Sequence, residues 1–389
     1  MTRKVAIIAV AQTKYEPSKS SQRMEELVYE VVKQVLQETG LKFTEDGTGI
    51  DAAVTVSDDI WDARTISDAP IGDVVGAHHR SEEKVAQEGA QGVFYAAATI
   101  LSGHHDIVLL AAHCKESQVL SRNLVTSCGF CPLFHRMLGF DYLSAAALQA
   151  TRYMYKHDIT REQCAKAVVK SYKNAKNNPY AQAYRDVTVE DVLNSPILAS
   201  PISVFDSYPV SDGACAMILA TEEKAKRLTN KPVWILGMGN CYDSHYLGDR
   251  ELADCRSLEL AAERAYRMAS ISNPLPDIDV AEISAHYSYQ ELLWTEGLGF
   301  CHKGEGGKLI DSGKTEFRGE LPVNPSGGTL VGNPALVSGM IRVSEIVLQL
   351  RGEAGARQVE GARIGLAHGT SGPCGQFHSV LILGADGGK

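Results

Sequence analysis

The stretch that decides the fold is GAQGVFYAAATILSGHHDIVLLAA, residues 89–112. Residues 89–102 are small and apolar, contain no proline and are followed by Gly103, a pattern that predicts a buried helix with a glycine after its last turn. Residues 106–112 (DIVLLAA) then form a short continuous apolar run, typical of a strand buried on both faces. A helix followed by such a strand indicates an α/β layer with a largely parallel central sheet.

The same alternation extends to both ends of the chain. Toward the N-terminus it predicts a strand at 5–13, a helix at 24–39 before Gly40 and a strand at 50–56. Beyond residue 210 it predicts strands at 214–220, 233–237, 280–284, 362–367 and 379–383, and helices at 222–228, 258–269 and 335–350. One α/β pattern therefore occurs twice, although the two halves share no strong residue-level similarity.

Residues 117–200 break this rhythm. They contain aromatic, Pro, Cys and His residues at 125–142, a helical stretch at 142–157 and the polar run YKNAKNNPYAQAYRD. A chain of 389 residues is too long for one ordinary core and suits two core halves with an insertion. The sequence thus predicts an N-terminal half at 1–116, an inserted loop domain at 117–200 and a C-terminal half at 201–389.

Composition excludes several classes of protein. A formal net charge of -9 argues against a broad phosphate-binding surface, so nucleic acid is not an expected partner. No run reaches the roughly 18 to 20 apolar residues that span a bilayer, and the N-terminus lacks a secretory signal pattern. We therefore expect a cytoplasmic protein with no membrane partner.

The cysteine pattern indicates reduced thiols. Nine cysteines, an odd number scattered from Cys114 to Cys374, do not resemble a secreted disulfide framework. Cys128 and Cys131, with His135 four residues on, have a spacing that suits three zinc ligands, but a second pair is missing. We assign no metal site and keep metal binding as the weaker alternative to a mobile loop with free thiols.

Several specific motifs follow one another in a fixed order. They are Phe205-Asp206 with Ser211-Asp212-Gly213-Ala214, VNPSGG at 323–328, QLRGEAGARQVEGAR at 349–363, Gly365-Leu366-Ala367-His368, and AAATILSGHHDIVLLAAHCKES at 96–117. Together they resemble the thiolase superfamily, most closely its sterol-carrier-protein-x branch and the related thiolase-like lipid-transfer proteins. The resemblance covers nearly the whole chain.

The resemblance implies an α/β thiolase fold. Two similar βαβαβαββ halves would form a five-layer α-β-α-β-α sandwich, with the inserted loop domain covering an acyl-CoA site. It also implies a homodimer core and, for this branch, a small zinc-ribbon and OB-fold partner subunit. Coenzyme A is expected as substrate or product, and no permanently bound cofactor is expected.

The chain departs from the family at the catalytic positions. Gly89 matches the nucleophilic cysteine, and glycine cannot form an acyl-enzyme. The family's Gly-His-Pro motif reads Gly332-Asn333-Pro334, which replaces an imidazole by a neutral amide. The second cysteine position falls near Thr370. An ordinary ping-pong thiolase cycle is therefore not expected.

One family element is kept in the second half. The branch's His-Asp-Cys-Phe motif, or the Tyr-Asp-His-Phe motif of its aldolase relatives, matches Ser284-Ala285-His286-Tyr287. His286 thus aligns with the aldolase histidine. The aldolases' motif tyrosine corresponds to Ser284 and their second tyrosine falls near Ala335, so both tyrosines are absent.

Four residues are candidates for catalysis. His286 is the first choice because an imidazole titrates near neutral pH, and Asn333 is assigned with it to hydrogen bonding a substrate carbonyl. Glu88 is a possible base and Tyr287 a lower-grade candidate. The alternatives are a buried, satisfied histidine, a turn asparagine, a helix-capping glutamate and a core tyrosine.

Further residues are assigned to binding. The backbone N–H groups of Gly89 and Gly372 are expected to form an oxyanion site, and Gly89 is expected to leave room for a bulky acyl group at the positive end of a helix. Arg122 and Arg136, near SCGFCPLFHRMLGF (127–140), are expected to contact coenzyme A, or this loop is a docking site for another subunit. Ser326 and Gly327 are assigned to substrate binding.

Three functions follow from these residues. The leading hypothesis is an acyltransferase-class enzyme that makes or cleaves a C–C bond in a 3-oxoacyl-CoA by direct attack of coenzyme A, without a cysteine acyl-enzyme. The second is a retro-aldol lyase on a 3-hydroxyacyl-CoA. The third is a non-catalytic acyl-CoA-binding scaffold subunit.

Overall fold

The first part of the chain forms one half of a large mixed sheet. The computed structural model describes residues 3–44 and 48–387. The strands of this half are β1 (Val5–Gln12), β2 (Ala52–Val56), β3 (Ser81–Val85), β4 (Ile107–Lys115) and β7 (Asp212–Thr221). Its helices are α1 (Met24–Thr39), α2 (Gly89–Leu101) and α7 (Glu222–Leu228).

The last part of the chain forms the other half. Its strands are β8 (Val233–Tyr242), β9 (Val280–Ile283), β10 (Ile364–Ser371) and β11 (Phe377–Gly384). Its helices are α8 (Arg256–Ala269), α9 (Pro274–Asp277), α10 (Ser288–Gly297), α11 (Gly306–Asp311) and α12 (Ser338–Arg351). Short 3₁₀ turns are η1 (Ala69–Ile71), η2 (Glu116–Gln118), η3 (Arg136–Leu138), η4 (Leu247–Asp249), η5 (Thr329–Val331) and η6 (Gly355–Arg357).

The two halves share one sheet. Its strand order is β3-β2-β4-β7-β1-β8-β11-β10-β9. The halves meet where β1 pairs with β8, through Ala6 with Trp234 and Ile7 with Val233. Only β2–β3, β2–β4 and β9–β10 are parallel among the paired strands of the described residues in this sheet. The prediction of a largely parallel sheet is therefore wrong. An apolar run predicts that a strand is buried, but it does not predict the direction of the strand.

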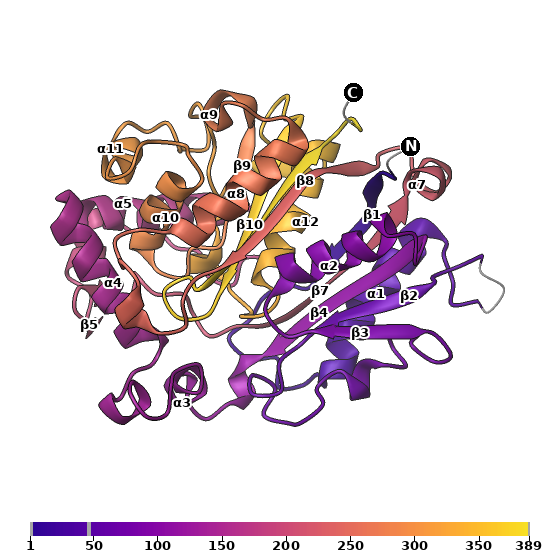
Figure 1. Ribbon diagram of the computed structural model, residues 1–389, viewed down its shortest axis with the longest axis horizontal. Coiled ribbons are helices and arrows are strands. Elements are labelled where there is room, and N and C mark those ends of the chain that lie inside the picture. The colour runs from indigo at the N-terminus through magenta and orange to yellow at the C-terminus, as the bar shows by residue number, and fades with distance from the viewer. Residues whose placement is uncertain (1–2, 45–47, 388–389) are drawn as a thin grey trace.

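Helices cover both faces of each half-sheet. α1 packs on β1, β4 and β7, whereas α8 packs on β8 and β11. Between these outer helices, α2 and α12 pack on each other, α2 against β2 and β4 and α12 against β9 and β10. The resulting layers are α1, the first half-sheet, the α2–α12 pair, the second half-sheet and α8 (Figure 1).

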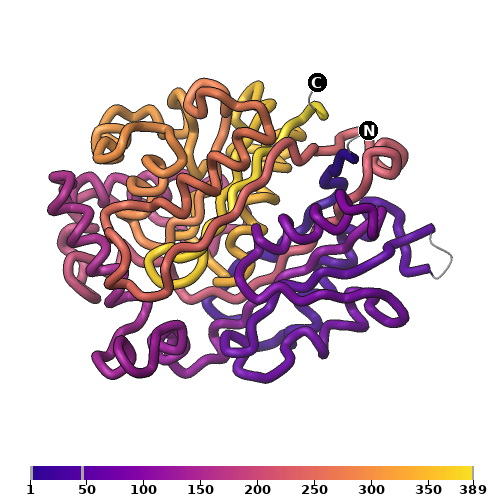
Figure 2. Tube along the Cα trace, viewed as in Figure 1, coloured from indigo at the N-terminus to yellow at the C-terminus, as the bar shows by residue number. Residues whose placement is uncertain are grey.

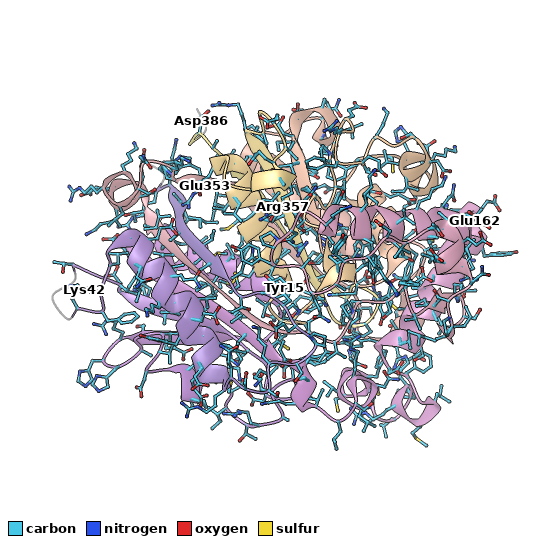
Figure 3. The ribbon with its side chains drawn as sticks, turned by 180° about the vertical axis from the view of Figure 1, so that it is seen from behind. Tyr15, Lys42, Glu162, Glu353, Arg357 and Asp386 are labelled. Atoms are coloured by element: carbon cyan, nitrogen blue, oxygen red, sulfur yellow. The ribbon has the colours of Figure 1, made fainter. Side chains whose placement is uncertain are left out.

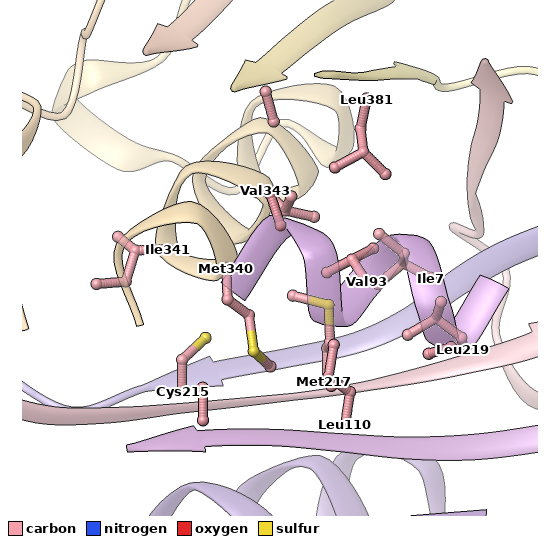
Figure 4. Close-up of a cluster of buried hydrophobic side chains, with 14 of the residues drawn as sticks. Ile7, Val93, Leu110, Cys215, Met217, Leu219, Met340, Ile341, Val343 and Leu381 are labelled. Carbon is pink, nitrogen blue, oxygen red and sulfur yellow. The ribbon is translucent and has the colours of Figure 1, made fainter. Parts of the chain in front are cut away.

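The core between the half-sheets explains why the central helices are apolar. Val93 of α2 and Met340 of α12 point into one cluster with Leu110 of β4 and Met217 of β7, as Figure 4 shows. These side chains are fully buried. Burial of each such side chain is favourable by about 1.5–3 kcal/mol, which accounts for the small and apolar composition of residues 89–101.

The inserted segment lies against the C-terminal half. It contains α3 (Arg122–Ser127), α4 (Tyr142–His157), α5 (Arg161–Ala175), α6 (Val189–Leu193), β5 (Ile197–Ala199) and β6 (Ile202–Ser203). Helices α4 and α5 both pack on α10, and α5 also packs on α11. The chain trace in Figure 2 accordingly places the magenta segment beside the orange one.

The strand order places residues 212–228 in a different half of the molecule from the one that the sequence pattern predicts. β7 pairs with β1 and β4, and α7 packs on β1 and β7, so residues 212–228 lie in the N-terminal half. The expected boundary at residue 201 placed them in the C-terminal half. We propose that the N-terminal half consists of 1–116 with 212–228, and that the C-terminal half begins at β8.

Tyr15 connects two segments of the chain near the centre of the molecule. Seen from behind, Tyr15 lies near the centre, whereas Lys42, Glu162 and Asp386 lie at the edges (Figure 3). Tyr15 is buried, and its backbone N–H donates to the Tyr180 carbonyl at 3.1 Å. It therefore links the end of β1 to the segment that follows α5.

Candidate functional site

One cavity collects side chains from both halves and from the insertion. Its volume is about 220 Å³. The connections β9–α10, η5–α12 and β10–β11 contribute to its wall, together with the loops after β2 and β3 and the end of β8. Its polar and thiol-bearing wall residues include Tyr142, Tyr208, His286, Tyr287, Asn333 and Cys374, and the turn residue Gly372 lies beside them.

His286 lies in this cavity with both ring nitrogens available. Neither nitrogen has a hydrogen-bond partner among the described residues, and neither is sealed from solvent. Its carbonyl oxygen accepts the Tyr208 N–H at 2.9 Å, which fixes the backbone. Burial lowers the pKa of His286 to about 4, and Arg122 and Arg342 lower it further through their charge. The imidazole is therefore neutral at pH 7, with one N–H and one free lone pair.

Asn333 is the most unusual polar group of the site. Its side chain is fully buried, and neither Oδ1 nor Nδ2 has a hydrogen-bond partner among the residues that the structure describes. The backbone N–H of Asn333 donates to Ser211 Oγ at 2.9 Å, and Tyr15 packs behind the preceding Gly332. A buried unpaired amide costs about 1–3 kcal/mol, so this turn keeps an unpaired amide, closed to solvent, at the cavity wall at the expense of stability.

Four tyrosines line the same cavity; Tyr242 is exposed, and the other three, Tyr142, Tyr208 and Tyr287, are not. Tyr287 was expected there, whereas Tyr142 and Tyr208 were not. The rings of Tyr208 and Tyr287 lie edge to face with centroids 5.7 Å apart. Burial raises the pKa of all three, that of Tyr208 to about 12, so each is a neutral phenol at pH 7.

Glu88 is a helix cap outside the cavity, and its assignment as a base is not supported. Its carboxylate accepts the N–H groups of Ala90 at 2.7 Å and Gln91 at 2.8 Å, at the start of α2. Cβ atoms added at Gly339 of α12 and Gly369 of β10 would meet the same carboxylate. Burial raises the pKa of Glu88 to about 7. It is absent from the cavity wall, although Gln87 lies in it.

Gly89 leaves no room for an acyl group, so that expectation is wrong. A Cβ at Gly89 would lie 2.5 Å from the Cβ of Met340 and 3.0 Å from its Cα. The close approach of α12 therefore fills the space of a nucleophile side chain. Glu88 accepts the N–H groups of Ala90 and Gln91, and Gly89 is absent from the cavity wall, so an oxyanion site at the Gly89 N–H is not supported.

The β10–β11 turn brings Gly372 and Cys374 to the cavity. Gly372 has φ 74°, a conformation that favours glycine, and lies on the cavity wall as expected. Cys374 also lines the cavity, and its Sγ donates to the Ala145 carbonyl at 3.2 Å. Burial raises the pKa of Cys374 to about 12, which keeps this thiol protonated and unsuited to nucleophilic attack.

Arg122 is not available to coenzyme A phosphates. Its guanidinium pairs with Glu116 and lies 3.9 Å from the centroid of the Tyr208 ring. It also donates to the Tyr208 carbonyl at 2.9 Å. The assignment of Arg122 to coenzyme A is not supported, because Glu116 and Tyr208 hold the guanidinium and Arg122 is absent from the cavity wall.

Arg136 stabilises its own loop. It is exposed and absent from the cavity wall. Its guanidinium donates to the backbone carbonyls of Ser127, Cys128 and Phe130 at 3.2–3.3 Å. Its assignment to substrate binding is not supported.

Ser326 and Gly327 also lie away from the cavity, which corrects their assignment. Ser326 Oγ donates to Glu282 at 2.8 Å and accepts from Arg342 at 2.8 Å, all in the interior. Gly327 has φ 94°, and a Cβ there would lie 2.9 Å from the Ser171 carbonyl. The VNPSGG loop thus surrounds a buried ion pair between Glu282 and Arg342.

The cysteine cluster of the insertion does not form a metal site. Cys128 is exposed, whereas His135 is buried among aromatic rings, 4.8 Å from Tyr246 between ring centroids. Within residues 3–44 and 48–387, no three His, Cys, Asp or Glu side chains are placed to hold a metal ion. Cys128, Cys131 and His135 thus have a sequence spacing that suits zinc, but the loop does not place them around one metal ion.

Comparisons with known proteins agree with this architecture. Residues 239–385 match the "Thiolase C-terminal domain-like" family. The acetyl-CoA acetyltransferase of Methanothermobacter thermautotrophicus is 35% identical over 384 residues, which cover 96% of this chain and 97% of that protein. The chain belongs to the thiolase superfamily. The resemblance inferred from the motifs and the expected thiolase fold are both confirmed.

Other relatives place this thiolase-superfamily chain near the sterol-carrier-protein-x branch. Sterol carrier protein 2 of Oryctolagus cuniculus is 37% identical over 221 residues, 56% of this chain and 40% of that protein. The solved structure of an "Ltp2-ChsH2(DUF35) aldolase" superposes with a TM-score of 0.84 and 26% identity, and covers 98% of both chains. No helix among the described residues has the length and hydropathy to cross a membrane.

The sequence predicted His286, Asn333, Tyr287 and Gly372 of the cavity wall, but not its other tyrosines, Tyr142, Tyr208 and Tyr242. Tyr208 lies between two quoted parts of one motif, Phe205-Asp206 and Ser211-Asp212. That position was the available signal, because binding and catalytic residues often lie on loops that a rigid scaffold positions. Tyr142, the first residue of α4, gave no such signal.

Proposed function

We propose that this thiolase-superfamily protein is a lyase that cleaves the C2–C3 bond of a 3-hydroxyacyl-CoA by a retro-aldol reaction. The observation that carries the proposal is the pairing of a free, neutral His286 with a free, buried Asn333 amide in a cavity whose one thiol, Cys374, is protonated and hydrogen bonded. Such a site suits proton transfer and charge stabilisation but not acyl transfer through a nucleophile.

In this reaction His286 accepts the proton of the 3-hydroxyl group. The C2–C3 bond breaks, C3 becomes a carbonyl carbon, and the bonding electrons form the enolate of a shorter acyl-CoA. Protonation of the enolate at C2 completes the reaction, so no cofactor or oxidant is consumed. A pKa of His286 near 4 makes the imidazole a weak base. The proton is therefore transferred from the 3-hydroxyl group as the C2–C3 bond breaks, so that little charge builds up on the imidazole.

Asn333 supplies the donor for the enolate. Its Nδ2 has no competing partner among the described residues, so a hydrogen bond to the thioester oxygen breaks none within the protein. The amide is closed to solvent, and we propose that substrate binding turns it toward the cavity. The backbone of Gly372 on the opposite turn is the second donor that we assign to this oxygen. The volume of about 220 Å³ suits the reacting end of a short acyl chain.

Direct thiolysis of a 3-oxoacyl-CoA is the second candidate. The name of the 35% identical archaeal relative, acetyl-CoA acetyltransferase, favours it. In this reaction the thiol of free coenzyme A attacks the 3-oxo carbon without an acyl-enzyme, because Gly89 provides no nucleophile. Asn333 has the same role in both reactions, since both generate an enolate.

Mass spectrometry of a substrate panel separates these functions. The protein is incubated with 3-hydroxybutyryl-CoA, 3-hydroxy-3-methylbutyryl-CoA, 3-hydroxy-3-phenylpropionyl-CoA and the matching available 3-oxoacyl-CoA esters, with and without free coenzyme A. We expect cleavage of a 3-hydroxy ester without added coenzyme A. Cleavage only of 3-oxo esters and only with coenzyme A would replace the lyase by the thiolysis candidate, and no cleavage would leave an acyl-CoA-binding scaffold.

The variant Asn333→Ala tests the assigned donor. Its turnover is expected to fall about 100-fold, as for removal of one oxyanion donor. The free energy of unfolding should not fall with it, because the amide has no hydrogen bond to lose. Ser211→Ala, which removes the acceptor of the Asn333 N–H and a 3.4 Å hydrogen bond to the Pro209 carbonyl but keeps the amide, is the matched control. Equal turnover of Asn333→Ala and the wild type would remove Asn333 from the mechanism.

We also propose that the insertion docks another subunit onto the homodimer core. Its loop exposes several large apolar side chains, namely Leu120, Leu124, Leu133, Phe134, Met137 and Leu138. Exposed apolar patches of this kind are typical of interaction sites. The aldolase neighbour is named with a second component, ChsH2(DUF35). Native mass spectrometry with the co-expressed genomic neighbour tests whether a small subunit binds, and loss of binding in Phe134→Asp locates it.

A further inference from the structure

Tyr208 lines the cavity, but the proposed reaction gives roles only to His286, Asn333 and Gly372. Tyr208 precedes β7 and is 5% exposed. Its hydroxyl makes no hydrogen bond with the described residues and is not sealed from solvent, so it faces the cavity that the ring lines. A buried phenol without a partner beside a reacting centre is a group with an unused proton.

The surroundings of Tyr208 hold its ring in one place. Arg122 lies 3.9 Å from the ring centroid on one face and also binds the Tyr208 carbonyl. Glu116 fixes Arg122 in turn. The edge of the Tyr208 ring meets Tyr287, with centroids 5.7 Å apart. A phenol held from two sides loses little further freedom when a substrate binds, which is what a positioned catalytic group requires.

Tyr208 is also directly linked to His286. Its backbone N–H donates to the His286 carbonyl at 2.9 Å, and the two ring centroids lie 5.1 Å apart. A substrate in the cavity therefore has an imidazole and a phenol beside it at a fixed separation. The cleavage of a 3-hydroxyacyl-CoA needs two such groups, one that takes a proton from the hydroxyl and one that gives a proton to C2.

We infer that Tyr208 is the catalytic acid that protonates C2 of the enolate, while His286 takes the proton of the 3-hydroxyl group. The O–H bond of Tyr208 breaks, its proton forms the new C–H bond at C2, and a phenolate remains. The proton on His286 then passes to the phenolate, which restores both residues and balances the cycle. This inference rests on the proposed function.

The charge of Arg122 supports this role. Burial raises the pKa of Tyr208 to about 12, and Arg122 opposes that rise more than any other group does. Glu116, Cys114 and Asp141 act in the direction of burial. A cation on the ring face stabilises the phenolate that the step produces. Arg122, which sequence reasoning assigned to coenzyme A, is in this account a positioning residue for Tyr208.

Exchange of the C2 hydrogens of acetyl-CoA and propionyl-CoA in D₂O tests the inference. By microscopic reversibility, the group that protonates C2 also removes a proton from it. We expect the exchange rate of Tyr208→Phe to be at least about 100-fold lower than that of the wild type, as for removal of a general acid–base group. Tyr155→Phe, which removes an exposed phenol of α4 outside the cavity wall, should keep the wild-type rate.

Two further readings separate the possible failures. Isothermal titration of acetyl-CoA should give the same dissociation constant for Tyr208→Phe and the wild type, which excludes misfolding as the cause of a loss. Exchange by Tyr208→Phe at the wild-type rate would overturn the role of Tyr208, whether or not the wild type cleaves 3-hydroxyacyl-CoA. A wild type that neither exchanges nor cleaves would overturn the lyase proposal and this inference together.

Discussion

Gly89 brings the first turn of α2 against α12 so closely that no side chain fits between them. A Cβ at Gly89 would lie 2.4 Å from the backbone N and 2.5 Å from the Cβ of Met340. We propose that this contact closes the place at which the family resemblance puts a nucleophilic cysteine. A single substitution back to cysteine cannot restore an acyl-enzyme, because the thiol would need the volume that α12 occupies.

We predict that Gly89→Cys destabilises the protein by about 1–3 kcal/mol through overpacking and forms no acyl adduct with acetyl-CoA. Urea unfolding measures the first effect and intact mass spectrometry the second. Gly89→Ala is the matched control, since its Cβ meets the same Met340 atoms without a thiol. An acylated Gly89→Cys protein with wild-type stability would contradict this account of the site.

At the residue scale, motif position predicted some of the site and not the rest. His286 and Asn333 were found because each lies in a short motif whose backbone turn carries it into the cavity. Arg122 was misassigned because its partners, Glu116 and Tyr208, come from different segments, and only the fold brings Tyr208 to it. The role of a long charged side chain depends on such partners, which the local sequence does not contain.

At the scale of elements, helix α2 depends on a buried carboxylate at its start. Glu88 accepts two N–H groups of the first turn, and Gly339 and Gly369 make room for it. The cap thus joins α2, α12 and β10 at one point. A helix start inside a protein needs such an acceptor, because water cannot reach its free N–H groups.

We expect Glu88→Ala to lower the free energy of unfolding by about 1–2 kcal/mol, the usual cost of a lost cap. Turnover per folded molecule should stay within a few-fold, since Glu88 lies outside the cavity wall. Both are measured at pH 6, by urea unfolding and by the cleavage assay. Glu88→Gln keeps one acceptor oxygen and should lose less stability. A Glu88→Ala protein with full stability and no turnover would instead make Glu88 a base.

Elements were easier to predict than their pairing. Helices α1, α4 and α7 have the bounds that periodicity predicts, because apolar spacing and end signals are local. Strand β3 was missed, since its sequence SEEKV is mostly charged and it lies at the edge of the sheet. Parallel or antiparallel pairing was wrongly predicted, because it depends on connections that span the whole chain.

At the scale of the molecule, the interior contains several histidines that burial keeps neutral. His368 Nε2 and His378 Nδ1 are 2.9 Å apart, and both side chains are fully buried. Burial lowers the pKa of His368 to about 3 and that of His286 to about 4. Glu88 is the opposite case, since burial raises its pKa to about 7.

These shifts link stability to pH. An unfolded histidine has a pKa of about 6.5, so below that pH the unfolded chain binds protons that the buried imidazoles refuse. The histidine contribution is complete above pH 6.5 and is lost as the pH falls toward 4 and then 3. For Glu88 the contribution is present below its unfolded pKa of about 4.5 and is lost as the pH rises through 7.

We predict that His286→Gln flattens the decline in stability between pH 6.5 and pH 4. The free energy of unfolding of the wild type falls by up to about 1.4 kcal/mol per pH unit for each histidine that the fold keeps neutral. The variant has one such histidine fewer. Because the His286 ring has no hydrogen bond among the described residues, the substitution changes little else. Urea unfolding at several pH values measures the difference, with His302→Gln, at an exposed position, as the control. Parallel curves for His286→Gln and the wild type would mean that His286 titrates in the folded protein as it does in the unfolded chain, and the neutral imidazole on which the cavity chemistry depends would have to be abandoned.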